Sequence, residues 1–251
     1  MTLEINLVPE FIDKAMSPLA ESVGNSAAGI WELTFGSHIK LWKQKQDYQH
    51  QLNYQDFVEK VNTKLKEIHP DELVEPSLHI IGPAIQDSKF YIDSEVLRGM
   101  FANLIAASMN KEKFKSVHPS YVEIIKQLSP DEGKILKFMK GKDFPFYNVY
   151  SQKERNGRLT LMKNFSILGF QAGCEHPTHI NIYLDNLNRL GLIQLDSTRF
   201  ILDHSRYEEI EENEFFKGAL ASIGHFDNIE KAKGFIESTA YGITFFNSCI
   251  E

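Results

Sequence analysis

The chain has 251 residues, of which 42% are hydrophobic and 24% are charged. This composition indicates a globular protein with one large domain or two small ones, and it excludes disorder along most of the length. The formal net charge of −7 disfavours general binding to nucleic-acid phosphates or to anionic membranes. Two cysteines are too few for a disulfide framework, so a reducing compartment is expected.

The first residues carry acidic groups and lack the basic start and apolar core of a secretory signal. No apolar run approaches the roughly 20 residues that a membrane-spanning helix needs. We therefore expect a cytoplasmic protein without a transmembrane span.

Ser17 and Pro18 are typical of a helix N-terminus, and apolar residues recur after them with helical period. A second stripe consists of the small residues Ala20, Gly24 and Ala28. Small side chains at this spacing let a partner backbone approach closely. The stripe therefore predicts packing against another helix of the same chain, with membrane contact or helix pairing between chains as the alternatives.

Helical patterns continue through the rest of the first half. The period of the apolar residues predicts helices over about 39–68, over 78–90 with Pro83 inside, and over 95–109 after Ser94 as cap. Residues 1–127 are therefore predicted to form a helical region.

The second half has a different character. Ser129, Pro130 and Glu132 form a capping-box sequence before a helix to about 140. Further elements are expected in the following order: β-prone pieces at 144–150 and 159–170, a helix over 178–190, a hairpin joining 192–195 to 200–202, an acidic helical insertion over 203–224, a strand over 231–238 and a last helix from 239 to about 249. This order is typical of a winged-helix module, so residues 128–251 are predicted to be winged-helix-like. The expected fold class is mainly α with a smaller α+β part.

The helix over 178–190 corresponds to the recognition helix of such a module. Its predicted outward residues are Thr178, Asn181, Asp185, Asn188 and Arg189. One cation and one acid on this face match protein contact better than the reading of DNA bases, which usually needs several basic or amide side chains. Asn181, Asn188 and Arg189 are therefore interaction candidates, and a winged-helix DNA-binding regulator is the alternative.

Cys174, His176 and His179 place three metal-binding residue types within six positions. A closed structural site needs a fourth ligand, and no second Cys/His cluster provides one. The simpler interpretation is that this segment is a polar loop before a helix, so no metal or other cofactor is expected. The sequence also lacks HExxH, GxxxxGK[ST] and GxSxG, and these absences favour a non-enzymatic protein.

One stretch resembles a known family. Residues 97–109 have the sequence LRGMFANLIAASM, and residues 117–131 have the sequence VHPSYVEIIKQLSPD. Together with LVEPS at 73–77 and TAYG at 239–242, they resemble the abortive-infection alpha domain family, Abi-alpha. The resemblance implies a role in bacterial defence against phage by abortive infection.

Within the resembling stretch, four polar residues are expected to face solvent, and they are further interaction candidates: Arg98, Asn103, His118 and Glu123. Capping or interhelical hydrogen bonding is the competing role for each of them. The function expected from the sequence is phage defence by protein or membrane interaction and not by catalysis. The partner is left open between a phage-derived protein and a second copy of the chain.

Overall fold

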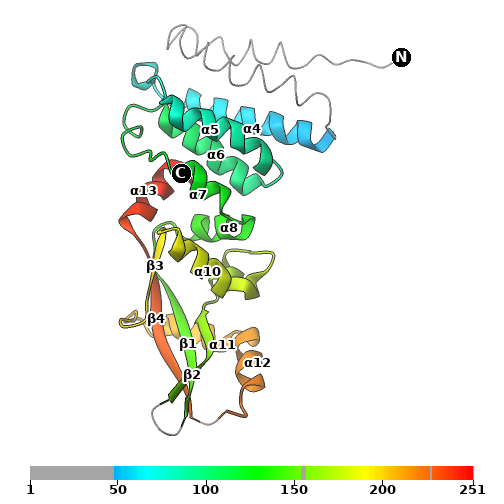
Figure 1. Cartoon of the computed structure of the whole chain (residues 1–251), viewed down its shortest axis with the longest axis vertical. Helices are drawn as coiled ribbons and strands as arrows, with labels where there is room; N and C mark the ends of the chain where they lie inside the picture. Colours follow the sequence, from blue (N-terminus) through cyan, green and yellow to red (C-terminus); the bar gives the residue numbers. More distant parts are fainter. Residues whose placement is uncertain (1–47, 154–156, 227, 251) are drawn as a thin grey trace, which may run out of the picture. The chain divides into compact units, whose positions relative to one another are not determined.

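The computed structural model describes residues 48–153, 157–226 and 228–250. They form two compact units, which are described one at a time (Figure 1). The N-terminal unit contains residues 48–127 with 248–250, and the C-terminal unit contains residues 128–247. The predicted small-residue stripe of Ala20, Gly24 and Ala28 lies outside the described residues.

The N-terminal unit consists of helices. Its elements are α4 (Tyr48–Lys66), the 3₁₀ turn η2 (Pro70–Glu72), α5 (Leu78–Ser88), η3 (Lys89–Tyr91), α6 (Glu95–Ser108) and α7 (Tyr121–Lys126). The helices predicted over 78–90 and 95–109 are confirmed, as is the described part of the helix predicted over 39–68.

Helix α6 is the centre of this unit and contacts α4, α5 and α7. Ser94 Oγ caps it by accepting a hydrogen bond from the backbone N–H of Leu97 at 3.4 Å. Leu104 and Ile105 are completely buried, and Ala102 lets a neighbouring helix approach closely because its side chain is small. The unit is therefore organised around one almost fully buried helix.

The C-terminal unit combines helices with a sheet. Its elements are α8 (Pro130–Met139), β1 (Phe144–Lys153), β2 (Gly157–Phe165), α9 (Leu168–Gln171), η4 (Pro177–His179), α10 (Ile180–Arg189), β3 (Ile193–Asp196), α11 (Ser205–Glu212), α12 (Glu214–Ser222), β4 (Ile229–Ser238) and α13 (Ala240–Cys249). The last two residues of α13 are counted with the N-terminal unit.

The four strands form one antiparallel sheet in the order β2-β1-β4-β3. Strand β3 pairs with β4, with Ile193 opposite Ser238 and Asp196 opposite Phe235. The predicted hairpin between 192–195 and 200–202 is therefore wrong. The apolar strand partner comes only after α11 and α12, whereas Phe200 and Leu202 are 49% and 84% exposed and belong to no strand.

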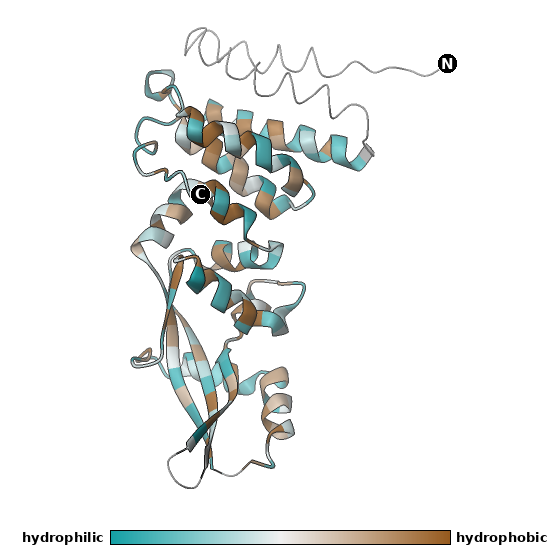
Figure 2. Cartoon of the chain, in the orientation of Figure 1, coloured by the Kyte–Doolittle hydropathy of each residue, from teal (hydrophilic) through white to brown (hydrophobic). Residues whose placement is uncertain are grey.

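Helices pack on the sheet through aromatic and apolar side chains. Tyr147 of β1 contacts Tyr207 of α11 and stacks on Phe216 of α12, so these two helices cover its face of the sheet. Helix α10 packs against β2 and β3 through a buried stripe that includes Leu184 and Leu187. The alternation of brown and teal along α10 in Figure 2 reflects this stripe and its polar opposite side.

Among the residues that the structure describes, no helix is both long and apolar enough to cross a membrane.

Hydrogen bonds of Thr239 hold the start of α13 close to the residue that precedes β3. Thr239 N–H donates to the Leu192 carbonyl at 3.1 Å, and the Thr239 hydroxyl accepts from the backbone N–H of Gly242 at 2.9 Å. This arrangement leaves no room at Gly242, because a Cβ there would overlap the Leu192 carbonyl.

Gly242→Ala is expected to lower the free energy of unfolding by about 1–3 kcal/mol, because overpacking against backbone cannot be relieved by a side-chain rotation. Gly99→Ala is the matched control, since a Cβ at this helical position meets nothing within 4 Å. The control should be neutral or up to about 1 kcal/mol more stable, in line with helix propensity. Urea unfolding followed by circular dichroism measures both, and equal effects would contradict the packing described.

Candidate interaction site on the C-terminal unit

The N-terminus of α8 carries the capping box that the sequence predicts. Ser129 Oγ accepts from the backbone N–H of Glu132 at 3.2 Å, and Glu132 Oε2 accepts from the backbone N–H of Ser129 at 2.6 Å. This reciprocal pair satisfies two N–H groups that the helix cannot satisfy internally. It also fixes the direction of the two carboxylates of the first turn, Asp131 and Glu132.

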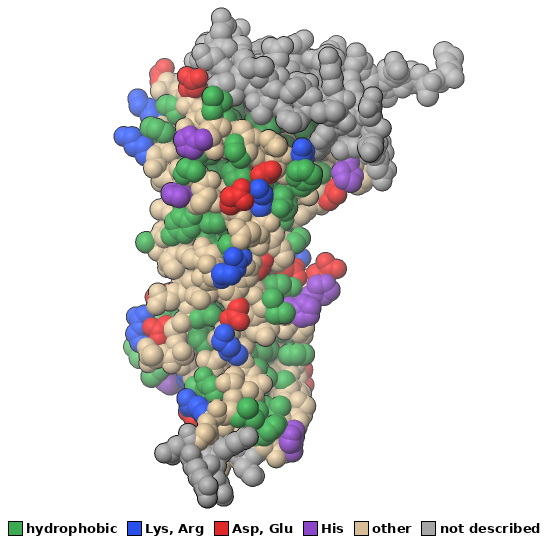
Figure 3. Space-filling view, in the orientation of Figure 1, with side chains coloured by type: hydrophobic (Ala, Val, Ile, Leu, Met, Phe, Trp, Pro, Cys, Tyr) green, Lys and Arg blue, Asp and Glu red, His purple; other side chains and the backbone are tan. Residues whose placement is uncertain are grey.

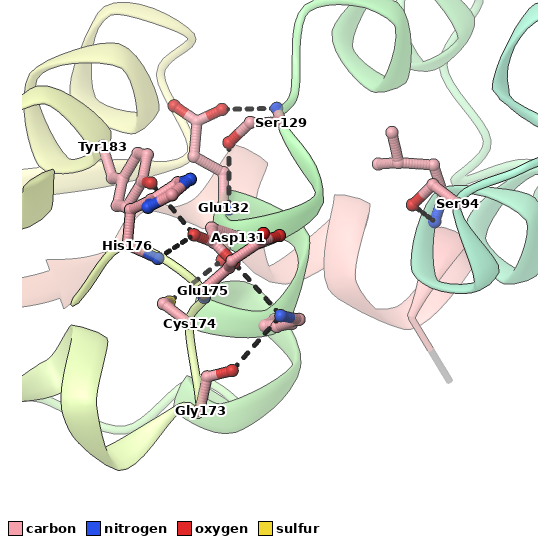
Figure 4. A network of polar contacts seen from close by, with 11 residues as sticks. Ser94, Ser129, Asp131, Glu132, Gly173, Cys174, Glu175, His176 and Tyr183 are labelled. Carbon is pink, nitrogen blue, oxygen red and sulfur yellow. Dashed lines mark hydrogen bonds and ion pairs between the residues drawn. The ribbon is translucent and has the colours of Figure 1, made fainter.

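Asp131 joins α8 to the loop that precedes α10 (Figure 4). Its carboxylate accepts hydrogen bonds from the backbone N–H groups of Glu175 at 2.8 Å and His176 at 2.9 Å, and from the Tyr183 hydroxyl at 3.0 Å. Lys134 Nζ adds an ion pair at 3.1 Å and donates to the Gly173 carbonyl at 3.2 Å. One buried carboxylate thus holds two backbone amides and two side chains.

These contacts and burial shift the pKa values of Asp131 and Cys174. Burial alone would raise the pKa of Asp131, but the backbone hydrogen bonds from Glu175 and His176, with those of Lys134 and Tyr183, outweigh it and lower the pKa to about 2. Asp131 is therefore a permanent anion near neutral pH and not a general base. Burial and the nearby Asp131 charge raise the pKa of Cys174 to about 11, which keeps the thiol protonated and a poor nucleophile.

Glu132 carries the network on to α10. Its Oε1 accepts from Asn186 Nδ2 at 2.7 Å, and Asn186 Oδ1 in turn accepts from Arg189 Nε at 3.1 Å and Nη2 at 2.6 Å. On the β2 side, Asp185 accepts from Asn164 Nδ2 at 2.9 Å and pairs with Lys163 at 3.1 Å. Helix α10 is thereby fixed from α8 and from β2.

The outer side of α10 is exposed as the sequence predicts. Asn181, Asp185, Asn188 and Arg189 are all exposed there, and Ile182 adds an apolar side chain that is 59% exposed. Because Asp185 and Arg189 have the intrachain partners named above, the face carries amides, paired charges and one isoleucine. On the face shown in Figure 3, basic and acidic side chains are interspersed and do not form a field of one sign.

The weak metal candidates do not converge as ligands. The Cys174 thiol donates to the Asp131 carbonyl at 3.6 Å, and the rings of His176 and His179 have centroids 5.4 Å apart. Within residues 48–153, 157–226 and 228–250, no group of three or more His, Cys, Asp or Glu side chains has the arrangement of a metal site.

Two candidates of the N-terminal unit are buried, which corrects the expectation that they face solvent. Arg98 pairs with Asp56 of α4 at 2.6 Å and donates to the Ile92 carbonyl. Burial would raise the pKa of Asp56, but hydrogen bonds from Lys60 and Arg98 lower it overall. Asn103 donates to the Cys249 carbonyl at 2.9 Å. Both residues lie inside the apolar surroundings of α6, where Arg98 has a counter-charge and the Asn103 amide N–H has an acceptor. The Asn103 Oδ1 atom is buried without a hydrogen-bond partner among the residues that the structure describes.

The other two candidates, His118 and Glu123, are exposed. His118 Nδ1 accepts from the backbone N–H of Ser120 at 3.2 Å, in the turn that precedes α7. Glu123 pairs with Lys126 at 2.9 Å. The hydrogen bonds of Arg98, Asn103, His118 and Glu123 thus lead to different parts of the unit and do not define one polar site.

Sequence reasoning missed the role of Asp131, although it identified the capping box around it. The available signal is local: an acidic residue beside a capping glutamate in the first helical turn. Its partners Glu175, His176 and Tyr183 follow 44 to 52 positions later, and no spacing rule connects them.

Comparison with known proteins gives one family and one partly similar solved structure. The family model described as abortive infection alpha matches residues 49–249. An uncharacterized protein from the hydrocarbon-degrading marine bacterium Alcanivorax borkumensis SK2 aligns in structure at 18% identity and a TM-score of 0.39, covering 56% of this chain and 96% of its own. No curated protein matches the chain.

Asp131→Asn is expected to lower the free energy of unfolding at pH 7 by about 2 kcal/mol, the amount that the lowered pKa represents. Since the folded-state pKa lies below the unfolded value, this stabilisation is present above about pH 4 and is lost as the pH falls toward 2. Urea unfolding at several pH values should therefore show wild type and variant converging in acid. Asp71→Asn is the control, because that side chain is 92% exposed and should have little effect. A difference that stays constant down to pH 2 would contradict this account.

Proposed function

Because the chain belongs to the abortive infection alpha family, we propose that it defends a bacterial cell against phage by binding a protein partner, without catalysing a reaction. The family match spans most of the chain, 49–249, so both described units belong to the proposed activity. The locked ionisation of Asp131 and Cys174 supports a binding role, since neither group is available for proton transfer or nucleophilic attack.

The observation that carries the proposal is the way α10 is presented. A hydrogen bond from Asn186 of α10 to Glu132 and one from Asn164 to Asp185 hold the helix, so its outer face meets a partner with little loss of conformational freedom. Ile182 provides an apolar anchor with the polar side chains of Asp185 and Arg189 on the same side of the helix, and Asn181 and Asn188 provide hydrogen-bonding groups on the adjoining side. An exposed apolar side chain within a polar rim is typical of protein interfaces.

In this proposal, α8, α10 and the paired strands β3 and β4 act together as the winged-helix-like part of the chain. In this proposal α10 takes the position of the recognition helix but contacts protein. The charges favour this choice, because Asp185 and Arg189 are engaged within the chain and the net charge is −7. A phosphate-binding surface would need several uncommitted cations.

The region 1–127 is proposed to sense or transmit the signal of infection, and the region 128–251 to bind the partner. His118 and Glu123 are the exposed candidates for the sensing part. Membrane contact through Ala20, Gly24 and Ala28 remains a separate prediction from sequence. Liposome leakage by wild type but not by Gly24→Leu would support it, and equal inertness of both would remove it.

Ile182→Asp is expected to abolish protection in a phage-challenged bacterial host, because a charge on the anchor cannot be desolvated in an interface. Leu202→Asp is the matched control: Leu202 is 84% exposed and lies outside α10, so protection should persist. Efficiency of plating across a phage panel measures the effect, with soluble protein levels and thermal melting compared in parallel. Protection by both variants, or none by wild type, would contradict the proposal.

A gel-shift titration against salt tests the alternative of a DNA-binding regulator. We expect no retardation at low salt. Retardation that weakens as salt rises and that is reduced by Arg189→Glu would favour DNA binding and overturn the protein-partner proposal.

A further inference from the structure

A row of aromatic rings runs from the core of the C-terminal unit to its surface. Tyr147 stacks on Phe216 with ring centroids 5.8 Å apart, and Phe216 stacks on Phe165 at 4.9 Å. Phe165 then stacks on Phe215 at 5.9 Å. Phe165 and Phe216 are buried, whereas Phe215 is 44% exposed. The row therefore ends in a ring that has one face supported by the core and part of its surface in water.

A second exposed ring completes this outer end. Phe170 of α9 is 37% exposed, and its ring centroid lies 6.3 Å from that of Phe215. We call these two residues the aromatic notch. Hydrophobic side chains (green) are visible at the surface in Figure 3 where Figure 1 draws α12.

The backbone segments that carry the two rings of the notch are fixed by a helix cap and by close packing. Asn213 caps α12 by accepting from the N–H groups of Phe215 at 3.1 Å and Phe216 at 3.2 Å. In α9, Gly169 packs so closely on Pro177 that a Cβ would lie 2.7 Å from the Pro177 carbonyl oxygen. The notch is therefore a preorganised apolar feature, which differs from an isolated hydrophobic residue on a loose segment.

One carboxylate lies beside the notch on the side of α11, and a second follows it on the same side of that helix. Gln171 Nε2 donates to Glu209 Oε2 at 3.3 Å, which places an acidic side chain beside the residue that follows Phe170. Glu212 lies three residues after Glu209 and hence on the same side of α11. Glu212 is exposed, and no hydrogen bond or ion pair of its side chain occurs within the described part of the chain. The notch thus joins aromatic faces to negative charge.

We propose that the aromatic notch with Glu209 and Glu212 is a docking surface for an arginine-bearing segment of a partner protein. A guanidinium group stacks on an aromatic face while its N–H groups donate to carboxylates, and arginine combines these two contacts better than lysine. The charge of the border selects a basic segment and repels an acidic one. An aliphatic residue beside the arginine covers the second ring.

This proposal deepens the protein-binding function proposed above but uses a surface other than the outer face of α10. The two are therefore separable by mutation. Ile182→Asp should leave binding at the notch unchanged, whereas notch variants should leave the α10 face unchanged.

The test begins with a displayed library of random dodecapeptides that is panned against the full chain. Enrichment of sequences with arginine next to an aliphatic residue is expected. The enriched peptide is then labelled and titrated by fluorescence anisotropy against wild type and variants. No enrichment, or enrichment of acidic sequences, would overturn the proposal.

Glu212→Lys and Phe215→Ala should each weaken binding of the enriched peptide about fivefold or more, the loss expected from one charge contact or one cation–π contact. Replacing the arginine by glutamate in the peptide should abolish binding. Glu67→Lys and Phe90→Ala are the matched controls, since both residues are exposed and lie in the N-terminal unit. Glu212→Lys serves even if Phe215→Ala fails to fold, because it alters only an exposed side chain. Equal weakening by Glu212→Lys and Glu67→Lys, or unchanged affinity in Glu212→Lys, would overturn the proposal.

Discussion

The buried carboxylate of Asp131 is the constraint on which the C-terminal unit depends. It replaces water around two backbone amides of the 173–176 segment and around the Tyr183 hydroxyl, groups that would otherwise be costly to bury. Its neighbour Glu132 extends the same first turn of α8 to Asn186. Because one helix end fixes both the preceding loop and the middle of α10, the exposed face of α10 keeps one orientation relative to the sheet.

The N-terminal unit also contains a buried charged group that links two helices, in this case a cation. Arg98 lies within α6 and is only 7% exposed, so its charge requires a partner, and Asp56 provides one from α4. In both units a buried polar group joins helices that apolar packing alone would leave free to slide. Arg98 and Asp131 are thus used inside the fold. The surfaces that we propose for function are exposed side chains of α10 and the ring pair at α9 and α12.

The features predicted from the sequence were those encoded within a few residues. The Ser94 cap, the Ser129–Glu132 capping box and the apolar stripe of α6 follow from local spacing, and all are present. The partner of β3 was mispredicted because the competing segment, β4, follows two inserted helices. The burial of Arg98 was missed because periodicity shows which residues are apolar but not which polar residue meets a counter-charge 42 positions away.

We propose that this family member acts by contact through the outer face of α10. A photo-crosslinking residue at position 188, compared with one at position 202, tests it most directly in phage-infected cells. We expect a discrete protein adduct from position 188 that disappears when Ile182→Asp is added, and no such adduct from position 202. Adducts of equal yield from both positions, crosslinking to DNA, or no adduct from position 188 would contradict it.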